Sequence, residues 1–128
     1  MKRVGKKPRA TTNGRKRRLA SDRARAAELD RLIAEVVVDA VGDTEQAAAF
    51  HYVLEEELEL PLQVELGAAI ATMVGLELTD DDRLVAVCRM GRSRRRVPLT
   101  ELAALAAPVK APRGSKWLDA YLRWARGR

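Results

Sequence analysis

Carboxylate side chains form two short clusters near the middle of the chain, and carboxylates are the ligands that hard metal ions prefer. One cluster surrounds a glycine turn at position 42, and the other lies where a helical pattern ends before a proline. The members are Asp39, Asp43 and Glu45 in the first cluster, and Glu55, Glu56 and Glu59 in the second. Calcium takes six to eight oxygen ligands, so either cluster could supply several of them. Neither is an EF-hand, because no D-x-D-x-D-G loop with a closing glutamate is present.

The second cluster falls at the C-terminal turn of the expected helix, where the backbone carries partial negative charge. Each carboxylate placed there costs roughly 0.3–1 kcal/mol, so the sequence predicts a positive neighbour. Two neighbours remain open at this point: a divalent cation, or the arginines at 89 and 94–96. A solvated acidic face without any partner is the third interpretation.

Basic residues form two further groups with the chemistry to bind phosphates. Residues 1–18 contain nine Lys and Arg and no acid, and five arginines follow between 89 and 96. Such groups bind nucleic acid by releasing its counterions. The residues assigned to this alternative function are Lys6, Lys7, Arg15, Lys16, Arg17, Arg18, Arg92, Arg94, Arg95 and Arg96. The first group equally fits a solubilising arm or an acidic protein partner, and the second equally fits pairing with the glutamates at 55–59.

Catalysis has no positive support in the pattern of residues. The single histidine, His51, and the single cysteine, Cys88, are not paired with a nucleophile or a base in the sequence. Neither a glycine-rich phosphate loop nor a metalloprotease helix motif is present. We therefore expect a protein that is not an enzyme, with both residues serving in packing.

Charge is strongly segregated along the 128 residues. Residues 1–27 contain eleven basic residues and one acid, residues 28–82 contain fifteen acids and one arginine, and residues 83–128 contain twelve basic residues and two acids. Either the basic ends neutralise the acidic middle within the fold, or each surface has its own charged partner. No apolar run reaches the length of a membrane span, and no apolar signal core follows the basic start. We expect a cytoplasmic protein without a membrane partner.

Hydrophobic periodicity predicts two consecutive helices. Apolar residues recur every three or four positions over 29–41, which indicates a helix over about 21–40 that stops at Gly42. A second helix should follow at once, with Asp43 as its N-cap and Gln46 three residues later in a capping box.

From residue 62 the pattern changes to the alternation of strands. Runs at 62–66, 70–78, 84–90 and 94–99 predict an antiparallel meander, followed by a short helix at 101–105 and a last helix at 116–126 that Ser115 caps. Trp117, Tyr121 and Trp124 form one stripe of that last helix, which we interpret as a docking face.

These elements predict an α+β fold: an N-terminal two-helix hairpin packed on a small antiparallel SH3-like barrel or sheet, with a C-terminal helix. Residues 1–18 are expected to be a disordered basic arm, because they contain almost nothing to bury. Residues 19–128 are expected to form a single domain.

Three stretches carry a family resemblance. V-D-A-V-G-D-T-E-Q at 38–46, with F-H-Y-V-L-E-E-E-L-E-L-P-L at 50–62, resembles the core motif of the small cyanobacterial calcium-binding proteins, the CcbP-like family. V-P-L-T-E-L at 97–102 is similar to the closing strand and turn of that family. The resemblance implies a compact helix-plus-small-barrel fold, no catalysis, and calcium held by acidic side chains. Carried over by position, Asp39, Glu45, Glu55 and Glu56 coincide with acidic positions of the motif. Those relatives are acidic, whereas this chain has a basic arm and an arginine-rich hairpin.

Overall fold

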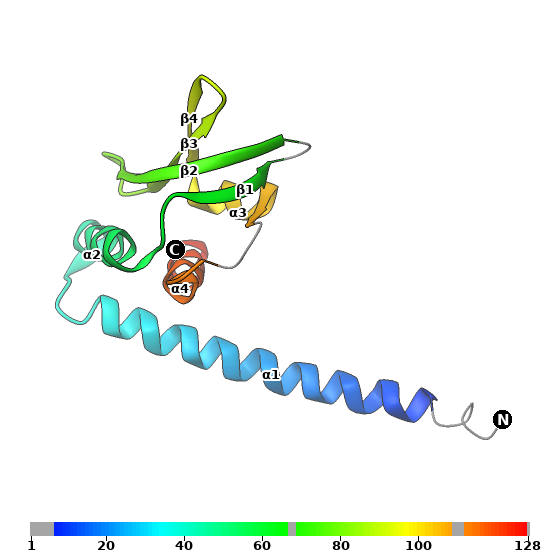
Figure 1. The fold of residues 1–128 in the computed structure, drawn as a ribbon. Coiled ribbons are helices and arrows are strands. Elements are labelled where there is room, and N and C mark those ends of the chain that lie inside the picture. The colour runs from blue at the N-terminus through cyan, green and yellow to red at the C-terminus, as the bar shows by residue number, and fades with distance from the viewer. Residues whose placement is uncertain (1–6, 67–68, 109–111, 128) are drawn as a thin grey trace.

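The computed structural model describes residues 7–66, 69–108 and 112–127 (Figure 1). Its helices are α1 (Lys7–Val36), α2 (Gly42–Glu57), α3 (Leu99–Leu105) and α4 (Ser115–Arg126). Its strands are β1 (Leu62–Leu66), β2 (Ala69–Leu78), β3 (Leu84–Met90), β4 (Ser93–Pro98) and β5 (Ala106–Pro108). The strands form one antiparallel sheet in the order β4-β3-β2-β1-β5. The predicted α+β fold is confirmed.

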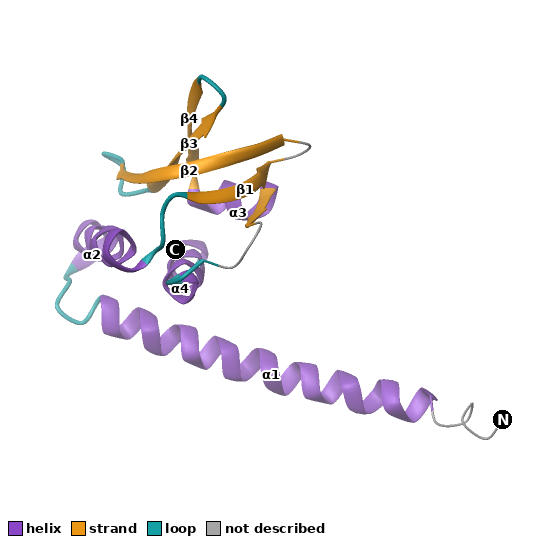
Figure 2. Cartoon of the chain, in the orientation of Figure 1, coloured by secondary structure: helices purple, strands orange, loops and turns teal. Residues whose placement is uncertain are grey.

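The molecule is layered. Figure 2 shows α2 and α4 between the sheet and α1, and α1 packs on α4 and on α2. Phe50 of α2 is fully buried at the centre of the core, with ring centroids 5.6 Å from Tyr121 and 5.2 Å from Trp124 of α4. The stripe on the last helix is therefore a docking face, as its spacing predicted. The buried hydroxyl of Tyr121 accepts a 3.1 Å hydrogen bond from the N–H of Leu84, which joins α4 to the start of β3.

Helix α1 begins fourteen residues earlier than the periodicity predicted. Residues 7–18, which the sequence predicts to be disordered, lie within this helix. Residues 1–6 lie outside the described residues. Arginine, lysine and alanine in this stretch are strong helix formers, whereas Thr11, Thr12, Asn13 and Gly14 are poor ones, so neither an apolar stripe nor propensity predicts the start of α1 at Lys7. The division into an arm over 1–18 and a domain over 19–128 stays a prediction.

The start of α2 differs from the predicted capping box. The N-cap residue is Val41 rather than Asp43, and its N–H donates a 2.7 Å hydrogen bond to a carboxylate oxygen of Glu45. Gly42 has φ of 80°, a backbone conformation that costs glycine little. Gln46 instead accepts a 3.0 Å hydrogen bond from the indole N–H of Trp124. A contact with the distant helix α4 thus replaces the local cap.

The sheet follows the predicted meander and adds a strand. β1, β2, β3 and β4 pair with their neighbours in sequence order, with a register shift in β2 between Met73 and Gly75. After α3 the chain returns along β1 as β5, where Leu66 pairs with Ala106. This strand was missed, because three residues are too short for an alternating pattern. At α4 the predicted cap is also wrong, since Gly114 is the N-cap and no side chain caps the helix.

Candidate functional site

The α1–α2 turn holds the first predicted carboxylate cluster. Asp39, Asp43 and Glu45 are all exposed, and Glu45 accepts the hydrogen bond from Val41. Beside Asp43 and Glu45, the hydroxyl of Thr44 donates a 2.8 Å hydrogen bond to a carboxylate oxygen of Asp82. This bond seats the turn between β2 and β3 against the start of α2, so a second acidic segment lies beside the first.

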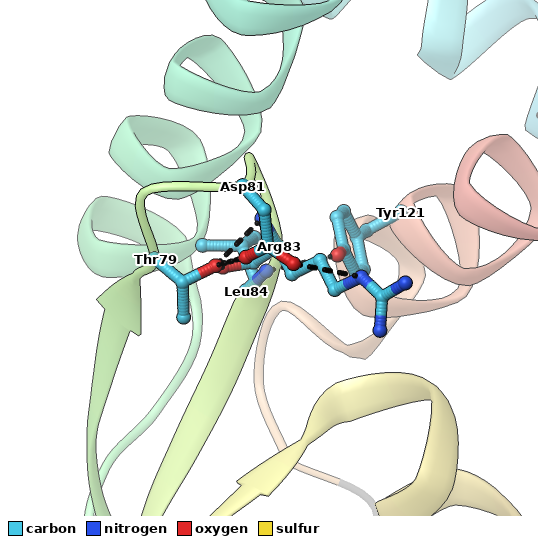
Figure 3. Close-up of polar contacts among 5 residues, drawn as sticks. All are labelled: Thr79, Asp81, Arg83, Leu84 and Tyr121. Carbon is cyan, nitrogen blue, oxygen red and sulfur yellow. Dashed lines mark hydrogen bonds and ion pairs between the residues drawn. The ribbon is translucent and has the colours of Figure 1, made fainter.

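The β2–β3 turn contains three consecutive aspartates, and its shape is fixed by Thr79 (Figure 3). The Thr79 hydroxyl donates to Asp81 and accepts a 3.1 Å hydrogen bond from the N–H of Arg83. The Thr79 N–H donates to the carbonyl of Arg83 over 2.8 Å, and Asp82 has φ of 64°. The hydrogen bond from Thr79 lowers the pKa of the Asp81 carboxyl, and the charge of Arg83 lowers it further.

This acidic turn was not among the predicted metal ligands. The sequence shows it as a run from Asp80 to Asp82, which reads simply as a polar turn between two strands. Nothing in the local pattern connects it to the α1–α2 turn, because the joining hydrogen bond spans thirty-eight positions. A signal was available in the Thr79 that precedes the run, since threonine hydroxyls order turns of this kind.

The second cluster lies at the C-terminal end of α2 and is not held by the arginine hairpin. Glu55, Glu56 and Glu59 are exposed, and Glu55 lies 3.3 Å from Nε2 of His51 without hydrogen-bond geometry. The one described ion pair of the hairpin joins Arg96 to Glu77 of β2 over 3.0 Å. Pairing of the hairpin with the α2 glutamates is therefore wrong for the part of the chain that the structure describes.

The positive neighbour of this end of α2 is the start of another helix. The N–H of Glu59 donates a 2.9 Å hydrogen bond to the carbonyl of Arg113, and Gly114 lies directly against the carbonyl group of Glu57. Gly114 is the N-cap of α4, so the positive end of the α4 dipole meets the negative end of α2. A helix terminus thus supplies part of the positive charge that the sequence predicted.

The donor chemistry of both clusters fits a hard cation, but their arrangement is not a finished metal site. Carboxylate oxygens, a threonine hydroxyl and turn carbonyls are all ligands of the kind that calcium uses. Within residues 7–66, 69–108 and 112–127, no group of three or more His, Cys, Asp or Glu side chains is placed to hold a metal ion. The assignment of the six predicted ligands stays a prediction.

The basic residues assigned to nucleic-acid binding fall on two separate surfaces. Lys6 lies outside the described residues, Lys7 and Arg15 belong to α1, and the side chains of Lys16, Arg17 and Arg18 are exposed on that helix. On the hairpin, Arg92, Arg94, Arg95 and Arg96 are exposed. Arg94 is paired across the strands with Arg89, which places like charges opposite each other.

The two residues considered for nucleophilic chemistry lie in packed positions. Cys88 is buried in β3, and burial raises the pKa of its thiol although nearby Arg95 opposes the change. Such a thiol is mostly protonated and a weak nucleophile at neutral pH. His51 lies three-quarters buried on α2 beside Glu55.

Comparison with known proteins places the fold. No family model matches the chain, and no curated protein matches it in sequence. Among solved structures, one described as a calcium binding protein in the calcium-binding form aligns with a TM-score of 0.60 at 18% identity, over 78% of this chain and 91% of that chain. The crystal structure of Anabaena CcbP aligns with a TM-score of 0.63 at 16% identity, over 77% of this chain and 89% of that chain. The chain has a CcbP-like fold.

The CcbP-like fold confirms the resemblance that the stretches at 38–46, 50–62 and 97–102 indicated. These stretches contain the end of the helical hairpin and the junction between β4 and α3, which are parts of the fold that pack together in the core. In the described part of the chain, no helix is both long enough and apolar enough to cross a membrane.

Proposed function

We propose that the chain binds calcium through the carboxylates of the α1–α2 turn and has no catalytic activity. The observation that carries the proposal is the hydrogen bond from Thr44 to Asp82, which sets two acidic turns side by side. Asp39, Asp43 and Glu45 are the ligands we assign, and Asp82 joins them. A structure with the same fold is described as a calcium binding protein in the calcium-binding form, which supports this choice of ion.

The electrostatic setting favours a cation at this place. The two turns contain six acids, Asp39, Asp43, Glu45 and Asp80 to Asp82, and one arginine, Arg83, which pairs with Asp81, so the net charge there is negative. Glu45 uses one carboxylate oxygen to accept from Val41, which leaves its second oxygen for an ion. Because the described residues form no ready-made ligand group, the side chains must approach one another on binding. We therefore expect weak affinity, with Kd of about 10⁻⁴ to 10⁻³ M.

Calcium titration followed by thermal unfolding tests the proposal. A ligand that binds only the folded state raises its stability by RT ln(1 + [L]/Kd), which is about 1.4 kcal/mol at ten times Kd. We expect millimolar CaCl₂ to raise Tm by several degrees. KCl at equal ionic strength is the control, because screening alone will stabilise an acidic surface. An equal rise in KCl would contradict calcium binding.

Two matched double variants locate the ion. Asp39→Asn with Asp43→Asn removes two charges from the α1–α2 turn, and Glu56→Gln with Glu59→Gln removes two from the end of α2. We expect the calcium-dependent rise in Tm to disappear in the first variant and to persist in the second. The reverse pattern would place the ion at the end of α2 and would sink the assignment to the turn.

A further inference from the structure

We propose that the N-terminal part of α1 binds double-stranded DNA by lying in its major groove. This surface, called here the basic helix segment, comprises residues 7–25. It is separate from the carboxylates assigned to calcium, so the failure of either proposal would leave the other unaffected.

Within the basic helix segment, residues 16–25 are exposed, and one described ion pair, from Arg25 to Asp119, links them to the other elements. Among the side chains described from Lys16 onward, those over 16–25 are exposed and Ala26 is the first that is partly buried. Nineteen helical residues, about 28 Å at 1.5 Å per residue, therefore precede the packed half of the helix. Figure 1 shows this blue end of α1 extending away from the sheet and the other helices.

Ion pairs fix the direction in which the segment extends. Arg25 pairs with Asp119 of α4, and Asp30 accepts two hydrogen bonds from the guanidinium of Arg123, at 2.7 and 3.2 Å. Leu32 is buried beneath them against the core. Because the packed half of α1 is held on α4, the basic half projects as a continuation of a supported helix.

The positions of the charges favour a groove over a flat partner. Lys16, Arg17 and Arg18 are consecutive, so they lie about 100° apart and cover more than half of the helix circumference. A flat acidic surface would meet only one of these faces. A DNA major groove, about 12 Å wide, has phosphates on both walls and accommodates a helix 10–12 Å in diameter.

The absence of an apolar stripe argues against a protein groove as the partner. Helices that dock on proteins present apolar anchors at i, i+3, i+4 and i+7. Over 16–25 the single large apolar side chain is Leu19, which is 53% exposed, while four of the other residues, Lys16, Arg17, Arg18 and Arg23, carry positive charges without a described ion pair. Duplex RNA fits less well than DNA, because its major groove is deep and narrow.

Phosphate contacts also stabilise the helical conformation of the basic helix segment. An isolated helix of this length is marginal in water, and neighbouring positive charges weaken it further. With about five phosphates neutralised, log Kd should change with log salt at a slope near 4.5, which corresponds to about 500-fold weaker binding between 50 and 200 mM.

Fluorescence anisotropy with a labelled 20-base-pair DNA duplex, from 50 to 200 mM KCl, tests the proposal. The helix variant combines Lys16→Gln, Arg17→Gln and Arg18→Gln. The matched hairpin variant combines Arg92→Gln, Arg94→Gln and Arg95→Gln, which removes the same charge from the β3–β4 hairpin, far from α1 in the fold (Figure 1). We expect at least 50-fold weaker binding at 50 mM for the helix variant and less than fivefold for the hairpin variant. Equal losses, or no salt-dependent binding by the wild-type protein, would overturn the proposal.

A second pair of variants asks whether the helix itself is required. Ala20→Pro retains every charge but interrupts the helix within the exposed part, and Ala20→Ser is its control. We expect Ala20→Pro to weaken binding at least tenfold and Ala20→Ser to change it less than twofold, with Tm of the body unchanged in both. Undiminished binding by Ala20→Pro would show a flexible arm rather than a helix in a groove.

Competitors distinguish the partner classes. Unlabelled DNA duplex should displace the probe at lower concentration than duplex RNA or heparin of equal charge. Preference for heparin or RNA would overturn the choice of DNA.

Sedimentation without DNA should show a monomer. A wild-type dimer that the helix variant abolishes would instead identify the acidic surface of a second copy as the partner.

Discussion

The Thr44 hydroxyl donates a 2.8 Å hydrogen bond to Asp82 and thereby joins the start of α2 to the β2–β3 turn. The two residues are thirty-eight positions apart, and Asp82 is held at φ of 64° within its turn. The bond is a direct polar link between the acidic turn and the helix that contains the predicted ligands Asp43 and Glu45. The same hydrogen bond therefore stabilises the fold and positions Asp82 for the proposed calcium site.

Thr44→Val should uncouple the two turns. The change keeps the shape of the side chain and removes the donor, so we expect the free energy of unfolding to fall by about 0.5–1 kcal/mol. We also expect the calcium-dependent rise in Tm to shrink, because the Asp82 turn is released. Thr44→Ser, which keeps the hydroxyl, is the control for both measurements by urea and thermal unfolding. A full calcium response in Thr44→Val would remove Asp82 from the proposed ligand set.

The sequence predicted those parts of the fold that depend on local periodicity. The alternation at 62–66 and 84–90 and the stripe of Trp117, Tyr121 and Trp124 all follow from faces buried against a core. The predicted cap of α2 was wrong because two other hydrogen bonds form there, one from the distant Trp124 and one from the neighbouring Val41. The indole N–H of Trp124 donates to Gln46, and the N–H of Val41 donates to Glu45. The local capping box therefore does not form.

The candidate site was only half predictable for a similar reason. Carboxylates near Gly42 are visible as a cluster in the sequence, but their approach to Asp82 depends on how α2 packs on β2.

The start of α1 was missed for another reason. Periodicity detects helices by their buried stripe, and residues 7–25 have none; propensity does not predict this start either, because Thr11, Thr12, Asn13 and Gly14 are poor helix formers.

Gly114→Ala should be strongly destabilising, because this position has two independent constraints. Its φ is 86°, where side chains are strained, and a Cβ would overlap the carbonyl group of Glu57 at the end of α2. We expect more than about 2 kcal/mol lost from the free energy of unfolding, measured with urea.

Gly127→Ala is the matched control for this prediction. Gly127 has φ of −83°, and the nearest atom to an added Cβ would be a carbonyl oxygen 3.5 Å away. We expect a change within about 0.5 kcal/mol. Equal stability of the two variants would mean that α4 can move off α2 without loss, contrary to the dipole contact described above.

Tyr121→Phe should lower the free energy of unfolding, because it removes the buried hydrogen bond from Leu84. Without the hydroxyl, the Leu84 N–H at the start of β3 loses its described partner, and a buried unsatisfied donor costs about 1–3 kcal/mol. Ring packing against Phe50 is retained, which isolates the polar contribution. Tyr52→Phe is the control, since Tyr52 is 66% exposed and should give almost no change in urea unfolding. A neutral Tyr121→Phe would indicate that solvent replaces the hydroxyl.

The ion pair between Asp30 and Arg123 makes the packing of α1 on α4 dependent on acidity. The hydrogen bond from Arg123, aided by its positive charge, holds the pKa of the Asp30 carboxyl below its ordinary value in the folded state. A carboxyl with a depressed folded pKa stabilises the fold above its unfolded pKa, and that contribution disappears as pH falls through the folded pKa. Arg123→Gln should therefore be less stable than wild type at pH 7, and the difference should vanish at pH values below the folded pKa.

Carboxyl NMR titration measures this coupling directly at Asp30. In Arg123→Gln the pKa of Asp30 should rise towards its ordinary value, whereas in the control Arg126→Gln it should stay depressed, because no described ion pair links Arg126 to Asp30. Both residues lie in the last turn of α4, so the two variants change the helix dipole environment similarly. Equal pKa values for Asp30 in the two variants would show that the general positive charge of α4, and not the specific pair, sets the acidity of this contact.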